Sequence, residues 1–519
     1  MAAIFLLPLR SAAQQAPGDE HPGKAPYDRW CAECHGFEGR GDGAAAGYML
    51  PRPRDFTRAL YQIRSTPSGA MPTDDDLMHI IDEGMPGTAM PGWTEQLSGG
   101  DRRALVEYLK TFSPFFEDAA AEPIDAGGAP RMGDDDIAAG RELYERLECW
   151  KCHGDLGRGD GTSAPTQEDE AGFPIRPADL SENWLFNGGG SVEQIYTRLI
   201  TGLNGTPMPS LGDVVQAGVA SEEDIWKLAH YVRGLSPERE PRPREVIRAA
   251  LVDATLPASP GDSIWAEVER FYVPLVGQII VKPRRFAPTV DGVWVQALHN
   301  GEELVVRLVW HDPSRSPDPI WNEWQQSVVE HMEPKEDTLG SAALADAFAV
   351  QFPTTRPTGM ELPYFLLGSE RSPVYLWRWQ SEPEQLGEAI ARGHSQIEPL
   401  AGAAVSGEAV FDRGEWRLLL RRSLVPADSV SRFTFTTGEA LPIAFFAWDG
   451  SNGEAGPPGS VSSWYYLYLA QPTSATVYAV PVIVTIMTAL LGLYVVARAQ
   501  RRERAANAGR APAPIETPA

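Results

Sequence analysis

Two pentapeptides decide the architecture of this chain: CAECH at residues 31–35 and CWKCH at residues 149–153. Each places two cysteines three positions apart and a histidine directly after the second cysteine. Two thiols at this spacing can form thioether bonds with the vinyl groups of one haem, and the adjoining histidine can then bind the iron. The sequence therefore predicts two covalently bound haem c groups. Their expected anchors are Cys31, Cys34, Cys149 and Cys152, and their expected proximal ligands are His35 and His153.

A redox-active CxxC pair and half of a zinc site are the other interpretations of such a motif. Zinc needs about four ligands per site, whereas Cys31 and Cys149 lie 118 positions apart, in separate repeats. A thioredoxin-like pair would stand in a βαβ unit, and the surrounding sequence does not predict one. The two motifs use all four cysteines of the chain, which excludes a disulfide-built scaffold.

The two motifs belong to an internal repeat. HGFEGRGDG (35–43) corresponds to HGDLGRGDG (153–161), and GMPGTAMP (84–91) corresponds to GLNGTPMP (202–209). Met90 therefore follows His35 at the same spacing as Met208 follows His153. Thioether sulfur suits haem iron and raises its reduction potential, so we expect Met90 and Met208 to be the sixth ligands, leaving neither iron an open position. The nearby competitors are Met71, Met78 and Met85.

Each repeat closes with a predicted amphipathic helix. Apolar residues recur at i, i+3, i+4 and i+7 from Leu105 to Phe112 and from Leu228 to Leu235. Ser-Pro follows both segments, and proline cannot continue the helical hydrogen bonds. The pattern predicts two small all-α domains, 22–116 and 135–237, joined by a linker at 119–130 that is rich in Ala, Gly and Pro.

The pattern changes after a second linker, at 237–246. From 263 to 470 the chain consists of short runs rich in Val, Trp, Tyr and Phe, separated by Gly, Asn, Pro and Asp. The segment HNGEEL (299–304) has the composition of a hairpin turn. These features predict a mostly antiparallel β-sandwich, in which the tryptophans pack in the core.

The two helical segments resemble class I cytochrome c domains. Each has a helix that leads into CxxCH, a Met-Pro loop and a closing helix with an aromatic residue. The resemblance covers 22–116 and 135–237 nearly end to end. It implies that haem c is attached after export, so both domains would lie on the outer face of a membrane.

The third segment, about 263–468, resembles the haem-binding γ subunit of ethylbenzene dehydrogenase and its relatives among the molybdenum oxidoreductases. The matching stretches are DAFAVQFP (346–353), LPYFLLGSERSPVYLWRW (362–379), GEWRLLLRRSL (414–424), PIAFFAWDGSNGE (442–454) and SVSSWYYL (460–467). The resemblance implies a β-sandwich. It also implies that family members hold a b-type haem through one methionine and one lysine.

This sequence departs from that family at both ligand positions. Leu366 and Leu367 stand where the methionine is expected, and the segment 451–459, where the lysine is expected, contains none. No lysine follows Lys335 anywhere in the chain. We therefore expect this domain to lack haem b. An unexpected pairing is the exception, and its candidates are Met360, His331 and His394.

Charge and hydropathy indicate a membrane protein that does not bind nucleic acid. The 519 residues include 45 Lys+Arg and 70 Asp+Glu, a net charge of −25, whereas nucleic-acid binding needs a basic face. Residues 475–497 carry no charge and are long enough to cross a bilayer. Four arginines follow within 498–504, which favours a cytoplasmic tail at 498–519. Residues 1–20 look like part of a secretory signal.

The sequence thus predicts a single-pass dihaem cytochrome of the cell membrane, with its N-terminal domains in the periplasm. It would pass electrons in a respiratory chain between a membrane donor and a terminal redox partner. The leading partner is a molybdenum oxidoreductase; a cytochrome b complex and a soluble cytochrome remain open. No Ser-His-Asp or paired-carboxylate arrangement is found, so no catalytic residue is predicted. The alternatives are a dihaem peroxidase or oxidase subunit with an open iron, and a sandwich that recognises a ligand such as a carbohydrate.

Overall fold

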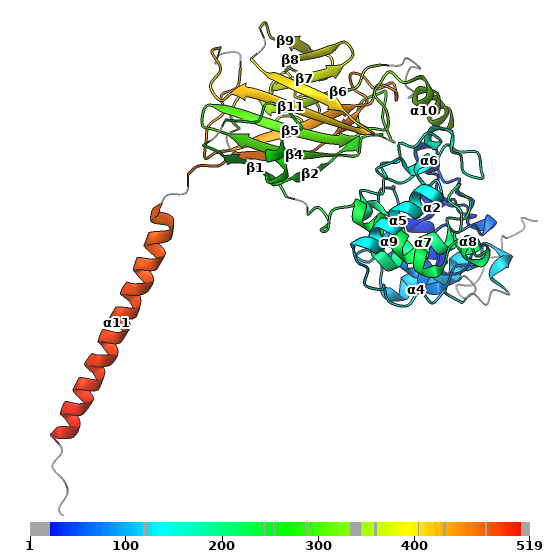
Figure 1. Ribbon diagram of the computed structural model, residues 1–519, viewed down its shortest axis with the longest axis horizontal. Helices are drawn as coiled ribbons and strands as arrows, with labels where there is room; N and C mark the ends of the chain where they lie inside the picture. The colour runs from blue at the N-terminus through cyan, green and yellow to red at the C-terminus, as the bar shows by residue number, and fades with distance from the viewer. Residues whose placement is uncertain are drawn as a thin grey trace, which may run out of the picture.

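The computed structural model describes residues 21–509 except 118–121, 243, 254, 287, 333–343, 358–360, 403, 429–431 and 473–474. The expected signal segment, Met360 and residues 510–519 of the expected tail lie outside the described residues. Figure 1 shows a helical part, a β-sandwich beside it, and one long helix that extends away from both. This arrangement confirms the predicted fold class.

The helical part consists of two domains with similar element order. The first contains α1 (Lys24–Trp30), α2 (Ala32–His35), α3 (Asp74–Glu83) and α4 (Gly99–Lys110), with 3-10 turns at Ala46–Tyr48, Phe56–Arg58 and Pro114–Phe116. The second contains α5 (Asp134–Arg146), α6 (Trp150–His153), α7 (Val192–Thr201), α8 (Gly212–Gln216) and α9 (Glu222–Leu235), with 3-10 turns at Ala164–Thr166 and Asn183–Leu185. α1 and α3 pack against α4, and α5 and α7 pack against α9.

Local sequence sets the ends of these helices. The side chain of Thr73 accepts a hydrogen bond from the Asp76 backbone N–H, and the Asp76 carboxylate accepts one from the Thr73 N–H. Ser221 and Asp224 form the same reciprocal cap at the start of α9. The closing helices α4 and α9 cover most of the predicted amphipathic segments: α9 ends at Leu235, directly before its Ser-Pro pair, whereas α4 ends at Lys110, ahead of the predicted last position Phe112.

The sandwich contains fourteen described strands. They are β1 (Val246–Leu251), β2 (Phe271–Pro274), β3 (Val276–Gly277), β4 (Gly292–His299), β5 (Glu303–His311), β6 (Ala347–Pro353), β7 (Val374–Ser381), β8 (Glu384–Ala391), β9 (Ile397–Pro399), β10 (Ser406–Phe411), β11 (Glu415–Ser423), β12 (Ala440–Trp448), β13 (Ser460–Val461) and β14 (Tyr465–Leu469). Helix α10 (Pro319–His331) lies between β5 and β6 in the chain. The main path runs β10-β11-β5-β4-β1-β14-β12-β6-β7-β8-β9.

Strand β12 joins the two layers of the sandwich. Its residues 440–443 pair with β14, and its residues 444–448 pair with β6. All of these strand pairs are antiparallel except those of β1, which runs parallel to both β14 and β4. β1 begins at Val246, ahead of the expected start at 263, so the sheet takes up the end of the predicted linker. The hairpin between β4 and β5 falls in the expected segment 299–304.

The core of the sandwich is rich in aromatic side chains from both layers. The rings of Trp310 on β5 and Phe348 on β6 lie 4.6 Å apart, and Trp379 lies 4.7 Å from Trp416. Trp310, Trp377 and Trp379 are all buried. Such rings fill a large volume between two sheets, and the prediction that the tryptophans pack in the core is confirmed for these three.

The C-terminal helix α11 (Ala475–Ala508) extends beyond the predicted span of 475–497. Residues 476–508 have a mean hydropathy of 2.3 in their most apolar window, and none of that window is buried against the rest of the chain. By length and composition this helix can cross a membrane. Figure 1 shows it separated from the sandwich and from the helical domains.

Candidate haem sites and the surfaces around them

The two CxxCH motifs form matching short helices, α2 and α6. In each, the second cysteine and the histidine donate their backbone N–H groups to the carbonyl of the first cysteine: the His35 N–H lies 2.9 Å from the Cys31 oxygen, and the His153 N–H lies 2.9 Å from the Cys149 oxygen. All four cysteines and both histidines are partly exposed. The helical turn therefore presents both thiols and the imidazole of one motif in a fixed relation.

Both histidines are held through Nδ1. His35 Nδ1 lies 2.9 Å from the Arg54 carbonyl oxygen, and His153 Nδ1 lies 3.0 Å from the Ala178 carbonyl oxygen. An Nδ1–H that donates to a carbonyl leaves the Nε2 lone pair available for a metal. Burial lowers the pKa of both imidazoles, which favours the neutral form that binds iron.

The GRGDG loops close the C-terminal ends of these helices. Gly41 and Gly159 each donate an N–H to the histidine carbonyl of their own motif, at 2.9 Å in both repeats. Gly36, directly after His35, has a φ of 75°, and a Cβ there would lie 2.1 Å from Asp42 Oδ1. A glycine is required at this position because the backbone is left-handed and the Asp42 carboxylate occupies the space of a side chain.

A buried tyrosine supports each motif, and the sequence analysis did not find it. Tyr27 Oη donates to the Gly36 carbonyl at 2.7 Å, and Tyr144 Oη donates to the Gly154 carbonyl at 2.6 Å. The two tyrosines are 117 positions apart, not 118, because one additional residue precedes the second motif. Glu148, at that place, has a φ of 59°. An aromatic residue one helical turn before each CxxCH was the available signal.

The methionine loops also have the same structure in both repeats. Thr88 Oγ1 donates to the Met85 carbonyl at 2.8 Å and accepts the Met90 N–H at 3.2 Å. Thr206 bonds the Leu203 carbonyl and the Met208 N–H at 2.9 and 3.2 Å. Met90 and Met208 are both partly exposed. Met208 packs on the apolar cluster that includes Cys149, whereas Met71 and Met78 pack on the corresponding cluster of the first domain.

Two arginines join the helical domains through backbone carbonyls. Arg64 is fully buried and donates to the carbonyls of Tyr61 at 3.1 Å and Thr201 at 2.7 Å. Arg198, on α7, donates to the Gln62 carbonyl at 3.2 Å and the Arg64 carbonyl at 2.5 Å. Thr201 ends α7 directly before the second methionine loop. The segment 61–64 of the first domain is thereby held against α7 of the second domain, close to the start of the loop that carries Met208.

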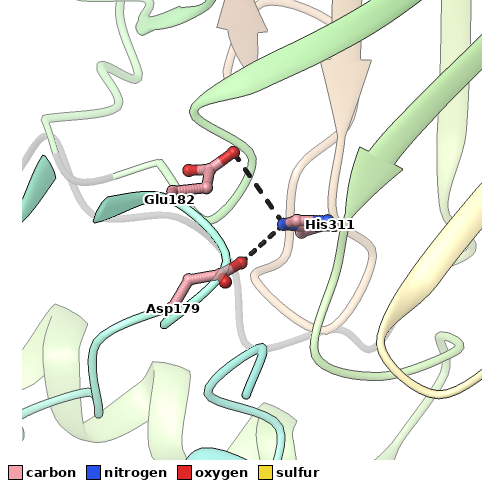
Figure 2. Close-up of side chains that lie close together, drawn as sticks. All are labelled: Asp179, Glu182 and His311. Carbon is pink, nitrogen blue, oxygen red and sulfur yellow. Dashed lines mark ion pairs between the residues drawn. The ribbon is translucent and has the colours of Figure 1, made fainter. Parts of the chain in front are cut away.

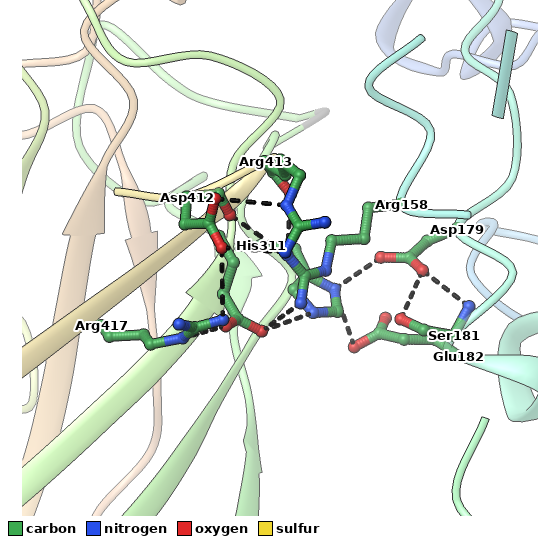
Figure 3. A network of polar contacts seen from close by, with 9 residues as sticks. Arg158, Asp179, Ser181, Glu182, His311, Asp412, Arg413 and Arg417 are labelled. Atoms are coloured by element: carbon green, nitrogen blue, oxygen red, sulfur yellow. Dashed lines mark hydrogen bonds and ion pairs between the residues drawn. The ribbon is translucent and has the colours of Figure 1, made fainter. Parts of the chain in front are cut away.

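The second domain meets the sandwich through its GRGDG loop. Arg158 donates to the Arg413 carbonyl at 2.7 Å and pairs with Glu415 at 2.8 Å, and its side chain is only 12% exposed (Figure 3). The corresponding residue of the first repeat, Arg40, is 59% exposed and pairs with its neighbour Glu38. The same sequence position thus has a local role in one repeat and an interdomain role in the other.

A half-buried histidine of the sandwich completes this contact. His311, at the end of β5, points between Asp179 and Glu182 of the second domain (Figure 2), and its Nδ1 lies 2.5 Å from Asp179 Oδ2 and 3.9 Å from Glu182 Oε1. Burial alone would lower the pKa of His311, but Asp179 and Glu415 raise it to about 10. The same pair lowers the pKa of Asp179 despite its burial. Sequence reasoning gave no signal for this contact, because its partners are remote in the chain.

Comparison with known proteins agrees with the three-domain organisation. Residues 18–109 match the family described as cytochrome C oxidase, cbb3-type, subunit III, residues 137–236 match the cytochrome c family, and residues 262–398 match the ethylbenzene dehydrogenase family. These domains define the chain as a c-type cytochrome, an electron-transfer protein with covalently bound haem c. Its first two domains match cytochrome c families, and its third matches the ethylbenzene dehydrogenase family.

Individual relatives include haem and γ subunits of redox enzymes. A putative respiratory nitrate reductase haem subunit of Haloferax mediterranei is 27% identical over 40% of this chain and 67% of its own length. The γ subunit of dimethylsulfide dehydrogenase of Rhodovulum sulfidophilum is 22% identical over 38% of this chain and 69% of its own. A solved chain of the reducing HAO-like protein complex of Kuenenia stuttgartiensis is 46% identical over 42% of this chain and 97% of its own, with a TM-score of 0.40.

Proposed function

We propose that this chain is a dihaem electron-transfer subunit, with one haem c in each helical domain. Cys31 and Cys34 anchor the first haem, and Cys149 and Cys152 the second. His35 and Met90 would hold the first haem iron, and His153 and Met208 would hold the second. The observation that carries the proposal is the Nδ1–carbonyl hydrogen bond of each histidine, made with the same geometry in both repeats. It leaves Nε2 of both imidazoles free to bind iron.

The residues around the first motif fit such a group. Trp93 Nε1 and Tyr61 Oη are buried without a hydrogen-bond partner among the described residues. Both belong to the apolar cluster that Cys31 also touches. Buried donors of this kind need an acceptor, and the propionates of a haem held at Cys31 would supply one. The bound haem would supply a reversible one-electron iron couple, and a histidine and a methionine of this chain would together leave the iron no position for substrate.

The domain contacts support electron passage between the two haems. Arg64 and Arg198 hold the first domain against α7 and against the start of the second methionine loop. Arg158 and His311 connect the second domain to the sandwich. The chain thereby fixes the two haem domains relative to each other, which short-range electron transfer requires.

The sandwich is proposed to lack haem b. Leu366 and Leu367, at the expected methionine position, are each 1% exposed and lie in an apolar cluster. In the segment where the lysine is expected, Asn452 donates to Glu454, and the Glu454 carboxylate pairs with Arg285. These positions are occupied by packing and by internal ion pairs. The sandwich would then serve to position the second haem domain and a partner.

The helix α11 is proposed as a membrane anchor, with the helical domains in the periplasm and the tail in the cytoplasm. Its apolar window is unburied, and its arginines follow that window. Removal of residues 472–519 should release the protein from membranes with its haem spectrum unchanged. Retention of the truncated chain in the membrane fraction would contradict the anchor.

The proposed partner is a molybdenum oxidoreductase, because the relatives include a nitrate reductase haem subunit and a dimethylsulfide dehydrogenase γ subunit. A cytochrome b complex would be the electron donor or acceptor on the membrane side. Purification of the tagged full-length chain in mild detergent should recover a molybdenum-containing subunit in a fixed ratio. Recovery of the chain with no redox enzyme would contradict this partner.

The haem assignment is tested by a pyridine haemochrome spectrum with haem counted per chain. We expect two covalent c-type haems, low-spin in both oxidation states, and none that extracts into acidified acetone. An extractable haem would overturn the proposal for the sandwich. A high-spin haem with peroxide turnover would instead favour the dihaem peroxidase alternative.

A further inference from the structure

Three carboxylates from different loops meet at one end of the sandwich. Asp312 directly follows β5, Asp346 directly precedes β6, and Asp449 directly follows β12. All three are at most 1% exposed. One carboxylate oxygen of each residue lies within 4.8 Å of those of the other two. Three like charges in so small a buried volume repel one another strongly unless protons or a cation neutralise them.

The surrounding loops hold two of these carboxylates in place. Asp346 accepts hydrogen bonds from the N–H groups of Ser316 and Gly450, at 2.8 and 3.0 Å, and from Trp416 Nε1 at 3.1 Å. Asp449 Oδ1 accepts from the Ser451 N–H at 2.9 Å and from other donors of the same loop. Backbone N–H donors favour the ionised form of a carboxylate. These donors fix the positions of the Asp346 and Asp449 carboxylates, while burial and the neighbouring Asp449 raise the pKa of Asp346 to about 7.

Asp312 differs, because one of its oxygens is left without a partner. Its Oδ1 accepts the Ser314 N–H at 3.2 Å, but the buried Oδ2 has no hydrogen-bond partner among the described residues. The guanidinium of Arg285 lies close enough to Asp449 for electrostatic attraction, but its ion pair is with Glu454, at 2.9 Å. Arg176 attracts Asp312 electrostatically, but it donates its hydrogen bond to the Thr289 carbonyl. Neither arginine has an ion pair with any of the three aspartates in the part of the chain that the structure describes.

We propose that Asp312, Asp346 and Asp449 bind one Ca²⁺ ion. Two oxygens bound to the same Ca²⁺ at about 2.3–2.6 Å lie no more than roughly 5 Å apart, which is the separation found here. The donors are all oxygen, and a hard cation prefers oxygen ligands. A deeply buried site favours Ca²⁺ over Mg²⁺, because Mg²⁺ keeps several of its water ligands.

The ion would connect the sandwich to the second haem domain. β5 belongs to one layer, while β6 and the end of β12 pair in the other, so a shared ion would tie the two layers together at this end. His311, which pairs with Asp179 of the haem domain, immediately precedes Asp312 in the chain. Binding of the ion at Asp312 would thereby fix the position from which His311 reaches the interface.

The first test is metal content and binding by the purified full-length protein with its haems in place. Mass spectrometry of the metals should find about one calcium per chain, in addition to iron. After removal of calcium with EGTA, calorimetric titration with CaCl₂ should show one site, and titration with MgCl₂ should show much weaker binding. A chain that holds no calcium and binds none, or that prefers magnesium, would overturn the proposal.

The second test uses Asp312→Asn, which keeps the Oδ1 acceptor for Ser314 and removes the charge. For the unaltered chain, added Ca²⁺ should raise the thermal midpoint over that in EGTA by about 5 °C or more. Asp312→Asn should lose this response, yet in EGTA it should be at least as stable as the unaltered chain, because charge repulsion is relieved. The exposed Asp253→Asn is the control and should keep the full response. If Asp312→Asn raised the midpoint equally in Ca²⁺ and in EGTA, the cluster would be a set of shared protons and not a metal site.

Discussion

His311 Nδ1 lies 2.5 Å from Asp179 Oδ2, and this ion pair crosses the boundary between the sandwich and the second haem domain (Figures 2 and 3). Asp179 directly follows Ala178, whose carbonyl accepts the hydrogen bond of His153. The sandwich therefore contacts the residue directly after the carbonyl that positions His153. Within the described residues, Arg158 and Glu415 form a second ion pair beside it.

The His311–Asp179 pair should make the domain contact sensitive to alkaline pH. The pKa of His311 is raised to about 10, so its contribution is complete below about pH 6.5 and is lost as the pH rises toward 10. The pKa of Asp179 is lowered, so its contribution is lost only as the pH falls below about 4. Amide hydrogen exchange of residues 176–182 should be measured from pH 6 to 10. After correction for the pH dependence of the intrinsic exchange rate, the protection factors of these amides should fall as the pH rises.

The variant His311→Asn isolates this effect. Loss of hydration and neighbouring carboxylates also raise the pKa values of Glu182 and Asp291, and both groups remain in the variant. The difference between the two proteins should therefore report His311 alone, and it should be largest at pH 6 and vanish near pH 10. Breaking a buried pair costs roughly 3–5 kcal/mol. An equal loss of protection at both ends of the pH range would contradict the assigned charge.

Replacement of Arg158 by alanine should loosen the sandwich from the second haem domain. The side chain is 12% exposed and bonds the Arg413 carbonyl and Glu415, so we expect a loss of about 3 kcal/mol. Arg40→Ala is the matched control from the other repeat and should leave stability nearly unchanged, because Arg40 is exposed to solvent. Proteolysis within residues 237–245 should become faster only for Arg158→Ala. Equal rates in both variants would show that Arg158 does not hold the interface.

Exchange of either proposed methionine ligand for histidine should lower the reduction potential of one haem and leave the other unchanged. Bis-histidine ligation gives lower potentials than His/Met ligation, and we expect a shift on the order of 100 mV. Potentiometric titration of Met90→His and Met208→His checks this separately for each domain. Met71→Leu is the control, since Met71 packs on the apolar cluster of the first domain. Loss of the methionine–iron charge-transfer band in Met71→Leu would reassign the ligand.

Substitution of Arg64 by methionine should separate the two haem domains without altering either haem spectrum. Arg64 is fully buried and donates to carbonyls in both domains, so its loss should cost about 2–4 kcal/mol. Arg58→Met is the control, because Arg58 reaches Glu170 across the same boundary but is 45% exposed. Flash reduction of one haem should show slower equilibration with the other in Arg64→Met only. Unchanged equilibration would mean that this contact does not set the haem separation.

Much of the architecture could be predicted because its determinants are local. The spacing of Cys31, Cys34 and His35 fits one helical turn, and its recurrence in the second repeat indicates covalent haem. The repeat identified the corresponding methionine loops, and their hydrogen bonds proved to be the same at Thr88 and Thr206. The repeat did not predict the supporting tyrosines, Tyr27 and Tyr144. One additional residue before the second motif places them 117 positions apart instead of 118.

The amino-acid sequence alone is enough to predict the two CxxCH motifs, the order of the three domains and the apolar C-terminal helix, because each depends on residues close together in the chain. Which charged groups meet depends instead on how the domains pack against one another. Arg40 and Arg158 occupy the same position of the repeat, yet only Arg158 is covered by the sandwich. His311 and Asp179 are remote in sequence and become a pair only when both are buried together. Burial removes water from such groups and strengthens every charge interaction among them. Their pKa values and their roles therefore depend on the folded structure and cannot be predicted from the sequence around each residue.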